Sequence, residues 1–163
     1  MISAVDFVSL DSFNSLRLQP DMAVVSIGDP ASTAPAIPPE IPNHRAEFLD
    51  MTPDELETYG MDADCLPQHA DIANIVGFLQ MIQAKDDPIR VVVHCRKGIS
   101  RSAAVALIAH ALSGCSFPRR PDAFDANRYV LQLAQAALSR SIVLPDSPVP
   151  GISWTFKPST LLI

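Results

Sequence analysis

Residues 91–105 read VVVHCRKGISRSAAV, an apolar run followed by a cysteine, two cations, a glycine and an arginine. The β-branched valines predict a buried strand that ends near Val93, and the alanine-rich segment beyond Ser100 predicts a helix. A strand, a glycine-containing turn and a helix in this order often present backbone N–H groups to an anion. This stretch therefore predicts the fold class and an anion-binding loop together.

The rest of the chain continues this alternation of strands and helices. Such a pattern is typical of an α/β fold with a central, mostly parallel sheet flanked by helices, in which ligands gather beyond the carboxyl ends of the strands. Cys95 lies at such an end. Residues 30–42 contain five prolines and are expected to cross the surface as an irregular loop, and an acidic loop is expected at 51–65. We expect strands at 5–8, 23–27, 44–50 and 89–93, and helices at about 67–83, 100–112 and 122–139.

The length and composition are those of one compact domain. The chain has 163 residues, of which 48% are hydrophobic, so we expect a single domain with a core over about 1–145 and a proline-rich tail over 145–163. The net charge of −6 provides no basic field for nucleic acid. The longest strongly apolar stretch, 103–112, is too short to span a membrane. Three widely spaced cysteines favour a reducing compartment, and we expect a cytoplasmic protein.

The loop between the predicted strand and helix has the chemistry of a phosphate site. Five residues separate Cys95 from Arg101, which lets the loop curl so that its backbone N–H groups converge on phosphoryl oxygens above the thiol. Arg101 can bind two of those oxygens in a bidentate fork, and Gly98 removes a Cβ where the loop must bend. The predicted substrate-binding residues are Arg96, Lys97, Gly98, Ile99, Ser100 and Arg101.

Cys95 is the predicted nucleophile. The converging amide dipoles, the amino end of the following helix and Arg101 should all stabilise its thiolate at neutral pH. Ser102 can donate a hydrogen bond to the sulfur and so help it to leave when a thiophosphate intermediate breaks down. This set of groups predicts nucleophilic attack on phosphorus.

These residues resemble the signature of the cysteine-dependent protein tyrosine and dual-specificity phosphatases, which reads His-Cys, five residues, Arg, then Ser or Thr. The matching positions are His94, Cys95, Gly98, Arg101 and Ser102. The short chain and the ISRSAA continuation look most like the small dual-specificity branch and compact bacterial tyrosine phosphatases. The resemblance is specific in the loop and extends loosely over about 24–145.

This resemblance implies a two-step reaction. Cys95 forms a cysteinyl phosphate that water then hydrolyses, without metal or cofactor, on a phosphorylated protein or a small phosphate monoester. The family uses the position of His94 to orient the loop and support the thiolate. It also uses an aspartic acid on a mobile loop, which protonates the leaving oxygen and then acts as a base towards water.

Several aspartates compete for the role of general acid. Asp50 is favoured because it ends the predicted strand 44–50, although it lies 45 residues before Cys95. Asp62 and Asp64 have a separation closer to that of the family, and Asp54 is a further candidate.

Other functions stay open at this stage. Arg96 and Lys97 could favour a substrate with several negative charges, such as a phosphoinositide, or they could simply point into solvent. A catalytically weak phosphate-binding module and a sulfurtransferase with a persulfide on Cys95 are the remaining alternatives. Cys65 could form a protective disulfide with Cys95, as resolving cysteines do in some relatives, but an incidental loop thiol is the favoured interpretation.

Overall fold

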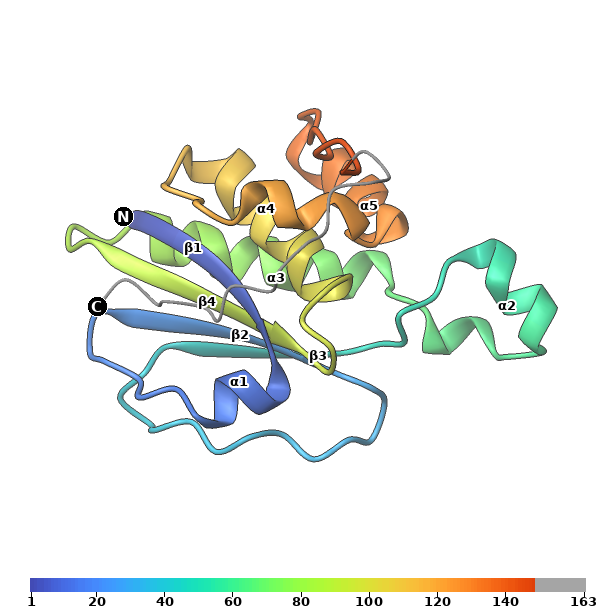
Figure 1. The fold of residues 1–163 in the computed structure, drawn as a ribbon, viewed down its shortest axis with the longest axis horizontal. Coiled ribbons are helices and arrows are strands. Elements are labelled where there is room, and N and C mark those ends of the chain that lie inside the picture. The colour runs from blue at the N-terminus through green and yellow to red at the C-terminus, as the bar shows by residue number, and fades with distance from the viewer. Residues whose placement is uncertain (149–163) are drawn as a thin grey trace.

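The computed structural model of the protein describes residues 1–148, and a sheet of four parallel strands lies at its centre (Figure 1). The strand order is β1-β4-β2-β3, so β4 is flanked by β1 on one side and β2 on the other. The α/β class with a parallel sheet is therefore confirmed. The strands are β1 (Ile2–Ser9), β2 (Met22–Gly28), β3 (Asn43–Glu47) and β4 (Ile89–Cys95).

The centre of strand β4, Val91–Val93, is apolar because both faces of the strand are covered. Val91 and Val93 pack into the larger hydrophobic cluster on one face, and Val92 packs into a smaller cluster on the other. Cys95 ends the strand beside Ser9 of β1, at the carboxyl edge of the sheet.

Three helices cover one face of the sheet: α3 (His69–Gln83), α4 (Arg101–Ser113) and α5 (Arg128–Leu138) (Figure 1). Helix α4 packs against β1, β4, α3 and α5. Its residues from Arg101 to Ala109 are all buried, including the polar Arg101 and Ser102. The helix that follows the predicted loop is thus fixed inside the core rather than lying on the surface.

The other face is covered mainly by irregular chain. Helix α1 (Leu10–Asn14) contributes Phe13, and the segment 30–42 contributes the buried Ile41 and the partly buried Ile37 (Figure 1). The prediction that 30–42 is irregular is confirmed, but this segment does more than cross the surface. Its two isoleucines, which lie between prolines in the sequence, pack into the smaller hydrophobic cluster and so complete a second core on this face of the sheet.

The prediction of an acidic loop at 51–65 is wrong in part. This segment contains helix α2 (Pro53–Tyr59) and a 3₁₀ turn at Ala63–Cys65. Glu55 closes a capping box with Thr52, which starts α2 locally. No residue of α2 is buried, and the helix projects from the body of the molecule (Figure 1).

The last helix begins later than the sequence pattern predicts. Residues Arg120–Asp125 form a 3₁₀ turn, so Asp122 does not cap α5. Asn127 does, because its Oδ1 accepts a hydrogen bond from the backbone N–H of Val130 at 3.0 Å. The proline-rich tail expected over 145–163 lies outside the described residues from 149 onward.

Within residues 1–148, none of the helices combines the length and the apolar character that crossing a membrane requires.

Candidate active site

The loop 96–100 joins β4 to α4 and curls around the thiol of Cys95. The backbone N–H of Gly98 donates to Cys95 Sγ at 3.3 Å, and Ser102 Oγ lies 3.2 Å from the same sulfur. Cys95 is only 1% exposed. The Gly98 amide therefore donates to a buried sulfur that is also within hydrogen-bond distance of the Ser102 hydroxyl.

Gly98 is required by the close approach of this loop to β1. Its φ is +67°, and a Cβ there would lie 2.7 Å from Ser9 Cα and closer still to Ser9 N and the Val8 carbonyl carbon. The carbonyl of Arg96 also accepts a hydrogen bond from Leu10 N–H at 3.4 Å. The loop 96–100 therefore packs directly against the end of β1.

Arg101 is buried and anchored by groups beyond the ends of β2 and β3. Its Nη1 donates to the carbonyls of Phe48 at 2.6 Å and Gly28 at 3.2 Å, and to Asp29 Oδ1 at 2.8 Å. Its Nε makes no hydrogen bond within the described residues, although it is buried. One part of the guanidinium is held by the protein, while Nε keeps its capacity to donate.

Asp50 lies after β3 and is hydrogen-bonded to the loop. Its Oδ1 accepts hydrogen bonds from Ser100 Oγ at 2.6 Å and from Asn127 Nδ2 at 2.9 Å, and its Oδ2 lies 4.0 Å from Arg101 Nε. The other aspartates considered from the sequence lie elsewhere. All are exposed, on α2 or in the segment after it: Asp54, Asp62 and Asp64.

A cavity of about 240 Å³ lies at the mouth of the loop, lined by Asp29, Asp50, Arg96, Lys97 and Arg101. Arg96 is exposed, and its Nη1 lies 3.9 Å from Asp29 Oδ2. Three cations and two carboxylates thus face one small volume, which suits an anion that must also exchange a proton.

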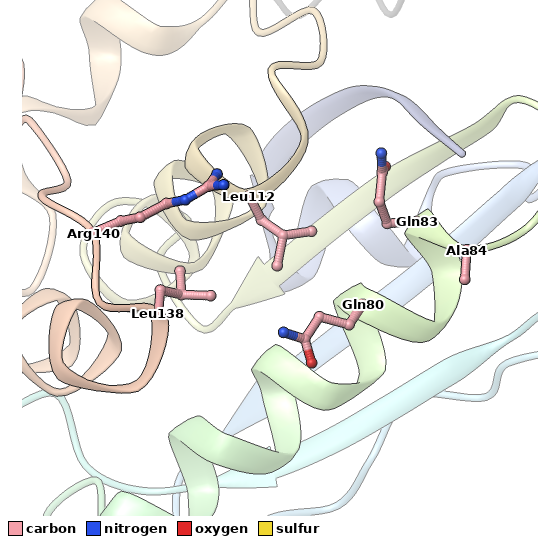
Figure 2. Close-up of a pocket in the computed structure, with 6 residues that line it drawn as sticks. All are labelled: Gln80, Gln83, Ala84, Leu112, Leu138 and Arg140. Atoms are coloured by element: carbon pink, nitrogen blue, oxygen red, sulfur yellow. The ribbon is translucent and has the colours of Figure 1, made fainter.

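A larger hollow of about 330 Å³ lies between α3, α4 and the chain that follows α5, far from this chemistry in the fold (Figure 2). It is lined by amides, aliphatic side chains and Arg140, whose Nη1 donates to the Ala111 carbonyl at 3.1 Å. It contains no nucleophile or acid–base pair, so we do not treat it as a catalytic site.

His94 is buried beneath the loop. Its ring stacks on Phe13 with a centroid distance of 4.2 Å, and neither ring nitrogen has a hydrogen-bond partner among the described residues. Burial, and then the positive charge of Arg45, lower the pKa of His94 to about 4. The ring is therefore neutral at physiological pH, and in this structure it contributes packing rather than a hydrogen bond to the loop.

The remaining predicted residues occupy the rim. Lys97 and Ile99 are exposed, and Ser100 is half-buried where α4 begins. Cys65, Cys95 and Cys115 are free thiols, and burial raises the pKa of Cys115. Among residues 1–148, no group of three or more His, Cys, Asp or Glu side chains is placed to hold a metal ion.

Two residues at the site escaped the sequence analysis. Asp29 stands in a turn directly after a predicted strand, so the rule that ligands gather at strand ends could have marked it. Asn127 gave no such signal, because it fell within the helix expected at 122–139. Both reach the loop only through the tertiary fold.

Comparisons with known proteins identify no relative: no family model, no curated protein and no solved structure matches the chain. The functional argument therefore depends on the site itself.

Proposed function

We propose that this protein is a cysteine-dependent phosphatase that hydrolyses phosphate monoesters through a cysteinyl-phosphate intermediate. The observation that supports this most directly is the position of Cys95 Sγ inside the curled loop 96–100, where it accepts a hydrogen bond from the Gly98 N–H at 3.3 Å and lies 3.2 Å from Ser102 Oγ. Arg101 and Asp50 line the cavity above. The site thus combines a thiol, a guanidinium and a carboxyl group around one cavity.

The first step forms a sulfur–phosphorus bond and breaks the ester bond between phosphorus and oxygen. Cys95 attacks as the thiolate, and Asp50 gives its proton to the leaving oxygen. In the second step the Asp50 carboxylate takes a proton from water, and the resulting hydroxide displaces sulfur from phosphorus. Ser102 donates a hydrogen bond to the departing thiolate, and inorganic phosphate is released. Cys95 is then again a thiolate, and Asp50 is again protonated.

The loop supplies the transition-state stabilisation. Phosphoryl transfer spreads negative charge over three equatorial oxygens, so donors that are already in place lower the barrier without reorganising. Helix α4 holds these donors in place because its first nine residues are all buried. Arg101 Nε makes no hydrogen bond to the described residues and is suited to donate to one of those oxygens.

The proposed substrates are phosphotyrosine proteins, or phosphotyrosine and phosphoserine/threonine proteins, and small monoesters. The exposed side chains of Arg96 and Lys97 at the cavity support a second candidate, a substrate with several phosphates such as a phosphoinositide. We place the activity in the cytoplasm, because a reducing compartment keeps the Cys95 thiol free to react.

The decisive experiment compares wild type, Cys95→Ser and Cys115→Ser on para-nitrophenyl phosphate, phosphotyrosine peptides and phosphoinositide vesicles. We expect turnover in wild type and in Cys115→Ser, whose altered thiol is buried away from the site. Cys95→Ser should lose turnover but still bind inorganic phosphate in calorimetry. Turnover by Cys95→Ser, or none by wild type on any of the substrates, would refute the proposal.

A further inference from the structure

Asn127 joins three parts of the molecule at the site. Its Oδ1 accepts from Val130 N–H at 3.0 Å, its Nδ2 donates to Asp50 Oδ1 at 2.9 Å, and its backbone N–H donates to the Ser100 carbonyl at 3.2 Å. The side chain is buried, with 7% exposure. Helix α5, the segment after β3 and the last residue of the loop therefore meet at one amide.

The orientation of this amide is fixed by its partners. The backbone N–H of Val130 can only donate, so it must face the amide oxygen. The NH₂ group then has to face Asp50. Because α5 packs against both α3 and α4, this donor is carried by a rigid part of the core.

The two oxygens of Asp50 are consequently not equivalent. Oδ1 accepts from Asn127 and from Ser100 Oγ, whereas Oδ2 lies 4.0 Å from Arg101 Nε and has no such donor among the described residues. An oxygen that already accepts two hydrogen bonds is a poor position for a proton. The proton of the neutral acid therefore belongs on Oδ2.

We propose that Asn127 is a positioning residue: by holding Asp50 Oδ1, it assigns Oδ2 as the oxygen that gives up and recovers the proton in catalysis. This inference rests on the proposed function. Helix capping alone does not require an amide here, since aspartate, serine and threonine also cap helices. Asparagine differs from them because it caps the helix with one atom and donates to Asp50 with another.

Two substitutions separate positioning from capping. Asn127→Asp and Asn127→Ser both keep an acceptor for Val130 N–H, so both should fold, as thermal unfolding will check. Neither provides the amide donor, and the aspartate adds a like charge beside Asp50. The readout is kcat/KM against pH on two esters: phenyl phosphate, whose leaving group needs a proton, and para-nitrophenyl phosphate, whose leaving group needs one far less.

We expect about a tenfold to hundredfold loss on phenyl phosphate and a much smaller loss on para-nitrophenyl phosphate. In Asn127→Asp the alkaline limb of the profile should also move up by about one pH unit, since a neighbouring carboxylate favours the protonated acid. Equal losses on both esters with an unmoved limb would overturn the inference and leave Asn127 as a helix cap. An inactive wild type would instead refute the proposed function.

Discussion

Substituting Gly98 by alanine tests whether the conformation of the loop 96–100 depends on its packing against the end of β1. At φ +67° a Cβ costs about 1–2 kcal/mol of backbone strain. The new atom would also meet Ser9 and Val8 backbone, which cannot rotate away as a side chain would, and such overpacking costs about 1–3 kcal/mol. We therefore expect Gly98→Ala to lower the free energy of unfolding by about 2–5 kcal/mol.

Gly114 offers a matched control for the backbone term. It ends α4 at φ +68°, and a Cβ there would have no atom within 4 Å. Gly114→Ala should therefore lose only the strain term of about 1–2 kcal/mol. Urea unfolding followed by circular dichroism measures both losses, and their difference is the cost of the collision.

Gly98→Ala should also change the reactivity of the Cys95 thiol. A loop pushed away from β1 moves the Gly98 N–H away from Cys95 Sγ, to which it donates at 3.3 Å. Alkylation of Cys95 by iodoacetamide at neutral pH should then slow relative to wild type and Gly114→Ala. Equal stability losses in the two variants, together with unchanged alkylation, would refute the reasoning about the loop.

Three further predictions concern titratable or charged groups in and beneath the site. Burial and then the positive charge of Arg45 lower the pKa of His94 to about 4, whereas the pKa is 6.5 in an unfolded chain. Between these two values the unfolded state therefore binds more protons than the folded state. The free energy of unfolding consequently falls as the pH falls through this range. His94→Asn should remove roughly 3 kcal/mol of that pH dependence in urea unfolding, and equal slopes would contradict this. Arg101→Lys should reduce kcat/KM about a hundredfold, because one ammonium cannot both keep the hydrogen bonds that Arg101 makes to the protein and bind phosphate. A loss below fivefold would show that bidentate phosphate binding by Arg101 is unimportant. Asp29→Asn should tighten inhibition by inorganic phosphate about tenfold, because a competing carboxylate 2.8 Å from Arg101 is neutralised, and weaker inhibition would count against that competition.

The central part of the fold was predictable because its determinants are local. Three consecutive valines, a glycine turn and an alanine-rich run predict a strand, loop and helix without knowledge of the rest of the chain. Asp50 was expected to end a strand over 44–50, whereas β3 ends at Glu47 and Asp50 lies three residues beyond it. The residue still contacts the loop, because the chain that leaves a parallel strand stays at the carboxyl edge of the sheet.

What escaped prediction depends on tertiary contacts or on competing local signals. Asp122 and Asn127 are both plausible helix caps, and only packing of the turn between them decides which is used. The ion pair of Asp29 with Arg101 joins residues 72 positions apart. Ile37 and Ile41 gave no periodic signal among prolines, although they help to close the second core.

Helix α2 buries no side chain, yet it begins three residues after Asp50. Its sequence is consequently free of the packing constraints that fix α4, where nearly every position is enclosed. Substitutions in α2 can therefore change the length, charge or shape of this helix while Cys95 and the loop 96–100 keep their packing. The candidate site is thus built from enclosed parts of the chain, whereas the helix that begins beside Asp50 is not constrained by the core.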